Sequence, residues 1–172
     1  MNINNMLSND TFLVNFNGTS KKHVLEELSK LAEIKLGVNS RSLLENLIKR
    51  EKLGSTAVGN GIAIPHANMD NIDKPYVFVC TLIDGLDFNS NDDIPVDIIF
   101  LLIAPDNKNS EHLQALALIS RILRNKELTI KLRGCKNTES ALAVIFQSIK
   151  QAAWKIIYLL DLKLAFCLQN LK

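Results

Sequence analysis

The chain has 172 residues, of which 47% are hydrophobic, 22% charged and 6% aromatic, and its 20 basic and 18 acidic residues give a formal net charge of +2. This length predicts one domain with a substantial buried core, and the balanced charge gives no indication of nucleic-acid binding. The cysteines, Cys80, Cys135 and Cys167, form no CxxC pair or disulfide framework, which favours a reducing compartment. The N-terminus lacks a signal-peptide pattern and no window of about 20 residues is free of charge, so we expect a cytoplasmic protein without an integral membrane segment.

The first part of the chain predicts a strand followed by two helices. Residues 11–16 are apolar and read as a short strand. Apolar residues at helical spacing follow, with Ser20 placed to cap the start of a helix and Gly37 to cap its end. A second helix is predicted to begin at Asn39 or Ser40.

The segment 53–68, LGSTAVGNGIAIPHAN, contains three of the seven glycines and one of the three histidines. Its glycines predict a turn-prone loop to which other groups can come close. Residues 62–64 read as a buried strand that Pro65 ends, and His66 follows at once. The order predicts an imidazole held at the end of a strand beside exposed backbone N–H groups, a suitable position for a nucleophile that handles an anion.

The second part of the chain predicts two buried strands and three helices. Residues 76–83 and 96–104 are rich in β-branched and aromatic side chains, and Asp84-Gly85 predicts a turn after the first of these strands. The residues between 68 and 75 read as a polar loop. The predicted helices cover residues 111–125, with Ser110 as N-cap, 126–133 and 138–150.

Together these elements predict an α/β domain with three layers, α/β/α, in which helices cover both faces of a mixed β-sheet. We assign residues 1–150 to this domain. Residues 151–172 form an atypical C-terminal tail, which we expect to be a packed helix or poorly ordered.

Three side chains are candidates for phosphoryl chemistry. His66 follows the glycine loop, His112 lies in the first turn of a predicted helix, and Arg50 lies near the end of another. A helix N-terminus disfavours imidazolium and attracts anions, so a neutral His112 could donate a hydrogen bond to a phosphoryl oxygen on His66. Guanidinium binds phosphate in bidentate fashion. The structural alternatives are an ordinary buried histidine, a helix cap and a solvated charge run.

We also assign Ser55, Thr56 and Asn60 to stabilisation of the phosphate, with turn formation as the alternative role of the two hydroxyl residues. The sequence has no GxGxxG, GxxxxGK[ST] or GxSxG motif, so nucleotide binding and serine hydrolysis have little support. It has no HxH or HExxH motif either, and we expect no metal and no cofactor.

Two blocks of the sequence resemble a known family. The segment LGSTAVGNGIAIPHA resembles the active-site signature of the fructose/mannitol-type (type 2) enzyme IIA domains of the bacterial phosphoenolpyruvate-dependent phosphotransferase system. The segment IPVDIIFLLIAPDNKNSEHLQALALISRILRNKEL is similar to the same family, and most similar to its free-standing nitrogen-regulatory members. The resemblance runs from about Thr11 to Ile149.

The resemblance implies that His66 is the phosphorylated histidine, that His112 supports the phosphoryl group and that Arg50 assists the transfer. It implies a transferase component that carries a phosphoryl group covalently, and a donor that is HPr or an HPr-like phosphocarrier. Two roles follow from the family, a regulator that binds target proteins and a sugar-transport subunit that phosphorylates a IIB domain. We favour the regulator. The alternatives of other classes are a non-catalytic protein-binding module and a metal-dependent hydrolase.

Overall fold

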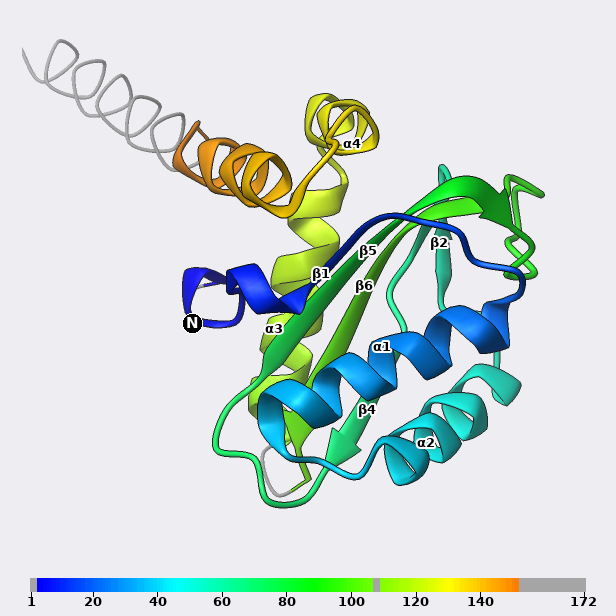
Figure 1. Ribbon diagram of the computed structural model, residues 1–172, viewed down its shortest axis with the longest axis vertical. Coiled ribbons are helices and arrows are strands. Elements are labelled where there is room, and N and C mark those ends of the chain that lie inside the picture. The colour runs from blue at the N-terminus through cyan, green and yellow to red at the C-terminus, as the bar shows by residue number, and fades with distance from the viewer. Residues whose placement is uncertain (1–2, 107–108, 152–172) are drawn as a thin grey trace, which may run out of the picture.

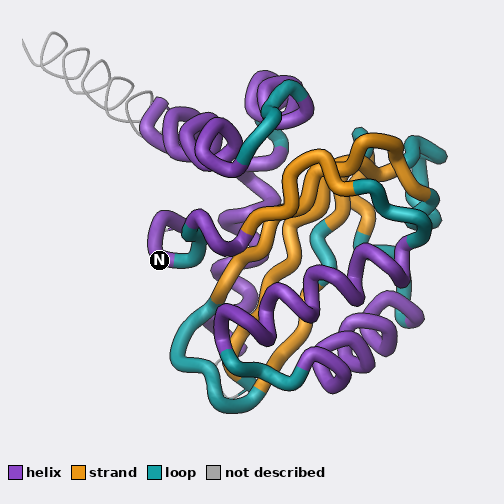
Figure 2. Tube along the Cα trace, viewed as in Figure 1, coloured by secondary structure: helices purple, strands orange, loops and turns teal. Residues whose placement is uncertain are grey.

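The computed structural model describes residues 3–106 and 109–151 and shows a mixed, six-stranded sheet between two layers of helices (Figures 1 and 2). The predicted three-layer α/β/α class is therefore confirmed. The strands are β1 (Phe12–Phe16), β2 (Ala57–Gly59), β3 (Ile62–Ala63), β4 (His66–Met69), β5 (Tyr76–Leu86) and β6 (Val96–Pro105). The helices are α1 (Lys21–Leu36), α2 (Ser40–Lys52), α3 (Asn109–Leu123) and α4 (Lys126–Arg133), and residues 138–151 are also helical. The predicted tail, apart from its first residue, lies outside the described residues.

Local capping chemistry sets the ends of α1 and α2, as predicted. The Ser20 hydroxyl accepts a hydrogen bond from the His23 backbone N–H, and Gly37 ends α1 with a left-handed φ of 71°. The Asn39 side chain accepts a hydrogen bond from the Ser42 backbone N–H at the start of α2. These two helices form one layer over the sheet (Figure 1).

The antiparallel pair β5 and β6 forms the centre of the sheet. Along β6, Ile98, Phe100 and Leu102 belong to the apolar cluster under α3 and the C-terminal helices, whereas Ile99 and Leu101 belong to the cluster under α1 and α2. Successive side chains of a strand point to opposite faces, so a strand covered on both faces is apolar at every position. This explains why the continuous apolar run predicted the strand correctly.

Three predicted boundaries are wrong. The turn at Asp84-Gly85 is absent, because β5 continues to Leu86, which pairs with Val96 across a register shift. A bulge therefore absorbs the turn-prone residues. Ser110 lies inside α3, which begins no later than Asn109, and the loop expected from residue 68 begins only after β4 ends at Met69.

The predicted glycine loop is in part a hairpin. Strands β2 and β3 pair antiparallel around Asn60 and Gly61, whose φ angles are 56° and 76°. Two consecutive left-handed residues are typical of a tight hairpin turn. The Arg133 side chain of α4 holds this turn, since its Nη2 donates to the Asn60 carbonyl at 2.8 Å and the same guanidinium binds Asp97.

Substitution of Gly61 by alanine tests this turn. A Cβ at Gly61 would lie 2.8 Å from Arg133 Nη2 and 2.9 Å from Asp97 Oδ1, on a backbone with positive φ. We expect the free energy of unfolding in urea to fall by about 1–3 kcal/mol. Gly134→Ala is the matched control. Gly134 has a φ of −83°, and a Cβ added there would lie no closer than 3.4 Å to a neighbouring atom, the Lys131 carbonyl oxygen. Equal stability of the two variants would contradict the role of the turn.

Candidate active site

His66 is the first residue of β4 and is held against the central strand. Strand β4 runs parallel to β6 with His66 opposite Leu102, and the Leu102 N–H donates to the Pro65 carbonyl at 2.9 Å. Pro65 separates β4 from β3, which pairs with the same strand. The histidine therefore follows the end of β3, as the sequence predicted, and it also begins a second short strand, which the sequence did not predict.

Both ring nitrogens of His66 have hydrogen-bond partners. Arg50 Nε lies 2.9 Å from His66 Nε2, and the Ile64 carbonyl oxygen lies 2.9 Å from His66 Nδ1. Because Arg50 can only donate, Nε2 must accept and carries no proton, so Nδ1 carries the proton and donates it to Ile64. The geometry thus selects one tautomer, with the nucleophilic lone pair on Nε2.

His112 of α3 stands edge-on to His66, with ring centroids 5.3 Å apart and an angle of 74° between the rings. Its Nε2 is buried and has no hydrogen-bond partner in the part of the chain that the structure describes. A buried polar atom without a partner is costly, and a ligand oxygen beside His66 would satisfy it. The structure therefore brings together the three side chains that the sequence singled out, His66, His112 and Arg50.

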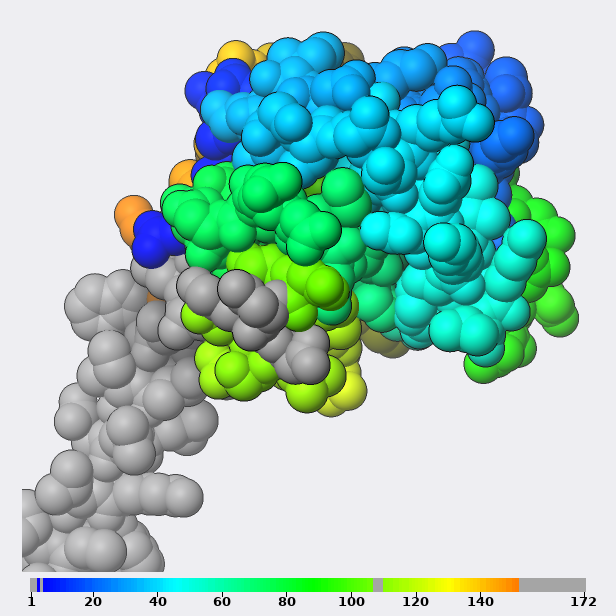
Figure 3. All heavy atoms as spheres, turned by 90° about the horizontal axis from the view of Figure 1, so that it is seen from below, coloured from blue at the N-terminus to red at the C-terminus, as the bar shows by residue number. Residues whose placement is uncertain are grey.

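These side chains line an open cavity of about 430 Å³ between α2, β4 and the start of α3. In the space-filling view, α2 in cyan and the start of α3 in yellow-green are exposed on one face (Figure 3). The residues that line the cavity are Asn46, Lys49, Arg50, His66, Ala67, Asn68, Asp106 and His112. Lys49 and Arg50 make it a suitable site for an anion.

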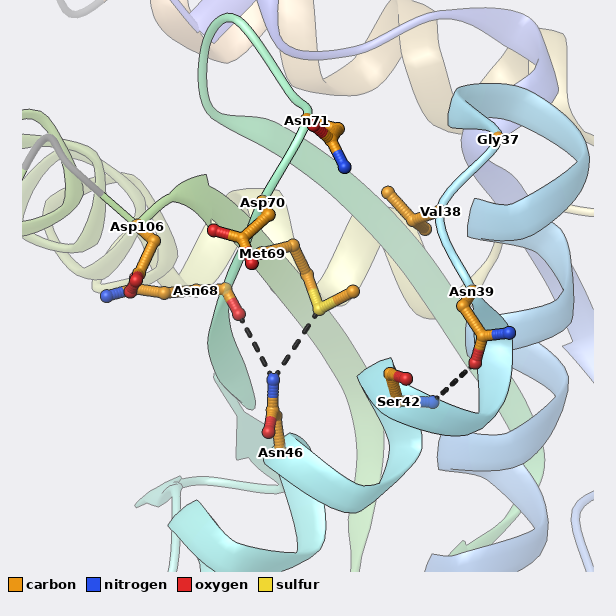
Figure 4. A pocket seen from close by; sticks show the side chains of 10 residues that line it. All are labelled: Gly37, Val38, Asn39, Ser42, Asn46, Asn68, Met69, Asp70, Asn71 and Asp106. Carbon is orange, nitrogen blue, oxygen red and sulfur yellow. Dashed lines mark hydrogen bonds between the residues drawn. The ribbon is translucent and has the colours of Figure 1, made fainter.

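A second hollow of about 440 Å³ adjoins the first and shares Asn46, Asn68 and Asp106 with it. In Figure 4 the Asn46 side chain points toward Asn68 and Met69, and its Nδ2 donates to the Asn68 carbonyl at 3.3 Å. The amide thereby fixes the edge of β4 to α2. Asn46 and Lys49 were not predicted as site residues. Asn46, Lys49 and Arg50 nevertheless occupy positions i, i+3 and i+4 of α2, a spacing that places side chains on one face of a helix.

The three predicted phosphate-stabilising residues have other partners. The Ser55 hydroxyl donates to the Phe88 carbonyl, and the Thr56 hydroxyl donates to Glu51 Oε2 at 2.7 Å. The Asn60 backbone N–H donates to Asp92 Oδ2 at 2.7 Å, in the turn of the hairpin. None of the three lines the cavity at His66. The structure therefore does not bring them to the side chains of His66, His112 and Arg50.

Burial lowers the pKa of His66, the backbone hydrogen bond to Ile64 opposes this, and the positive charge of Arg50 lowers the pKa further. Burial also lowers the pKa of His112, with a contribution from repulsion by His66. The ordinary value for imidazole is 6.5. Both rings are therefore neutral at pH 7, the state that a nucleophile and a neutral donor require.

We expect an NMR titration of the His66 ring to have its midpoint below 6.5, the ordinary value. The midpoint lies below this value because a lowered pKa lets the neutral ring persist to more acidic pH. In Arg50→Ala the midpoint should rise, since the nearby positive charge is gone. A wild-type midpoint at or above the ordinary value would contradict the burial and charge that the structure gives to this ring.

Two further observations concern a metal site and a membrane-spanning helix. Within residues 3–106 and 109–151, no group of three His, Cys, Asp or Glu side chains is arranged to hold a metal ion. None of the helices in these same ranges combines the length and hydropathy of a membrane span.

Comparison with known proteins identifies first the fold and then the family of this chain. The fold matches that of nitrogen-regulatory protein IIA-Ntr from Neisseria meningitidis, with a TM-score of 0.78, 29% identity, and coverage of 83% of this chain and 98% of the other. The family model described as "Phosphoenolpyruvate-dependent sugar phosphotransferase system, EIIA 2" matches residues 5–148. The chain belongs to this family of phosphoryl-carrying transferase components, which confirms the resemblance.

Curated relatives include both kinds of family member. The "Nitrogen regulatory protein" of Bradyrhizobium diazoefficiens is 39% identical over 145 residues, which cover 84% of this chain and 95% of the relative. The "PTS system fructose-specific EIIABC component" of Bacillus subtilis is 29% identical over 151 residues, 87% of this chain and 24% of that protein. The solved mannitol IIA of Escherichia coli shares the fold, with a TM-score of 0.69, 20% identity, and coverage of 81% of this chain and 98% of the other.

Proposed function

We propose that His66 accepts a phosphoryl group on Nε2 from the phosphohistidine of an HPr-like carrier protein, in the cytoplasm. The observation that carries this proposal is the hydrogen bonding of the ring, which leaves Nε2 unprotonated at the cavity while Nδ1 donates to Ile64. A neutral imidazole with a fixed tautomer is a competent nucleophile at pH 7.

In the proposed step, the Nε2 lone pair of His66 attacks the phosphorus of the donor. A new N–P bond forms, the N–P bond of the donor breaks, and the donor imidazole leaves with the electron pair of that bond. Arg50 releases Nε2 and its guanidinium binds the phosphoryl oxygens, while His112, in the tautomer with the proton on Nε2, donates to one of them. Catalysis then consists of positioning and charge stabilisation.

The proposed role is regulatory, with target proteins that distinguish the phosphorylated from the unphosphorylated form. The nitrogen regulatory proteins of Bradyrhizobium diazoefficiens and Pseudomonas aeruginosa, 39% and 38% identical, support it. The second candidate is a sugar-transport IIA that passes the group to a IIB domain. It is favoured by the 32% identity to the fructose-specific EIIA component of Haloferax volcanii, over 86% of that protein.

The test is incubation of the purified protein with phosphoenolpyruvate, enzyme I and a carrier protein. We expect one acid-labile phosphoryl group per chain, with phosphorus bonded to the Nε2 of His66 in the NMR spectrum. An unlabelled protein, in an assay where another enzyme IIA is labelled, would overturn the proposal and favour the binding module. Rapid transfer from the labelled protein to an isolated IIB domain would favour sugar transport over regulation.

A further inference from the structure

Glu51, the residue after Arg50, has a largely buried carboxylate bound on several sides. Its side chain is only 10% exposed. It accepts hydrogen bonds from the Thr56 hydroxyl at 2.7 Å and the Thr56 backbone N–H at 3.1 Å, and Lys21 Nζ of α1 lies 3.1 Å away. The carboxylate therefore ties the end of α2 to the start of α1 and to the loop before β2. It does not line the cavity at His66.

One chain of hydrogen bonds runs from this carboxylate to the protonated nitrogen of His66. Thr56 is bound by Glu51, and its carbonyl oxygen accepts a hydrogen bond from the Ile64 backbone N–H at 3.0 Å. The Ile64 carbonyl then accepts the Nδ1–H of His66 at 2.9 Å. Thr56 thus helps to hold the backbone that carries the acceptor for Nδ1, together with the pairing of β3 and β4 with β6.

A second chain runs to the other nitrogen through Arg50. Arg50 Nη1 donates to the Gly54 carbonyl at 3.0 Å while its Nε donates to His66 Nε2. Gly54 lies between α2 and Thr56, and its N–H donates to the Glu51 carbonyl at 3.2 Å. The loop that Glu51 holds therefore also anchors the guanidinium.

We propose that Glu51 is a positioning residue for phosphoryl transfer, which fixes the tautomer and orientation of His66 and the guanidinium of Arg50 through the loop at Thr56. The proposal rests on the proposed function of His66. A carboxylate suits this role because each of its oxygens can accept two hydrogen bonds, whereas an amide has one accepting oxygen and a donor in place of the other. The pairing with Lys21 offsets the cost of burying the charge.

The experiment compares Glu51→Gln with a matched control, Glu33→Gln. Glu33 of α1 makes a similar pair of hydrogen bonds at the start of α2, since its carboxylate accepts from the Ser40 backbone N–H at 3.1 Å and from the Ser40 hydroxyl at 2.9 Å. Glu33 is exposed and does not line the cavity at His66. Two quantities are measured, the rate constant for phosphorylation at saturating carrier and the ¹⁵N spectrum of the His66 ring.

For Glu51→Gln we expect the rate constant to fall about 10- to 100-fold, with little change in the carrier concentration for half-maximal rate. We also expect the ¹⁵N spectrum to change from a single Nδ1–H tautomer to a mixture. Glu33→Gln should match the wild type in both. Thr56→Val removes one of the hydrogen bonds and should give a smaller effect of the same kind, and it carries the test if Glu51→Gln does not fold.

A wild-type rate in folded Glu51→Gln would overturn the inference, as would a slower rate with an unchanged tautomer. Failure of the proposed function is distinguishable from failure of the positioning role of Glu51. If the wild-type protein is not labelled, or if His66→Ala is labelled as well as the wild type, the proposed function fails. The tautomer in Glu51→Gln needs no phosphorylation and still decides whether Glu51 orients the ring.

Discussion

Replacement of His66 with alanine is expected to reduce phosphorylation by the carrier by at least about 10³-fold, because the variant lacks the attacking atom itself. The side chain is partly exposed at the cavity and makes no contribution to the two apolar clusters. We therefore expect the fold to persist. The measurement is time-resolved labelling from phosphoenolpyruvate through enzyme I and the carrier, with circular dichroism to verify the fold.

Substitutions of the other two histidines serve as controls for this result. His112→Ala should still be labelled, but more slowly, because it loses a donor to the phosphoryl group and keeps the nucleophile. His23→Ala should be labelled at the wild-type rate, since His23 lies on α1 and its ring contacts Thr19 and Phe16. A labelled His66→Ala protein, or loss of labelling in His23→Ala, would contradict the assignment.

Replacement of Arg50 with alanine is expected to lower the rate constant for phosphorylation by about 100- to 1,000-fold, the usual effect of removing one preorganised donor from a site of developing negative charge. The guanidinium is already in place in the resting protein, since its Nε donates to His66 Nε2 and its Nη1 donates to the Gly54 carbonyl. Stopped-flow or quenched-flow labelling would measure the change.

Arg50→Lys separates charge from geometry. Lysine keeps the positive charge but is a point donor, and it cannot bind the loop carbonyl and the ring nitrogen with a planar fork. We expect a rate between those of the wild type and Arg50→Ala. A wild-type rate in Arg50→Lys would show that charge alone is required, and a wild-type rate in Arg50→Ala would exclude Arg50 from the transfer.

The sequence was most informative where structure depends on neighbours along the chain. The caps at Ser20 and Gly37 follow from side-chain chemistry within one helical turn, and they were predicted correctly. The buried run of β6 was also recognised, since a strand covered on both faces needs no partner to be identified. The turn expected at Asp84-Gly85 was wrong, because pairing of Leu86 with Val96 overrides the local preference.

Prediction of the site had a similar limit. His66, His112 and Arg50 were each predicted from residue type and motif, and the structure brings them together around one cavity. The partners of Ser55 and of Glu51 could not be read from the sequence. Ser55 binds a carbonyl 33 positions further along the chain, and Glu51 reaches Lys21 30 positions before it. Such pairs depend on how the layers are assembled.

The interruption at Pro65 has a consequence for how a partner could distinguish the two forms of the protein. Strands β3 and β4 are both anchored on β6, so the backbone is fixed on each side of the histidine. A phosphoryl group added to such a rigid support alters local charge and shape without displacing a strand. We therefore expect amide hydrogen exchange in β6 to be the same in both forms, and recognition to depend on direct contact with the modified surface.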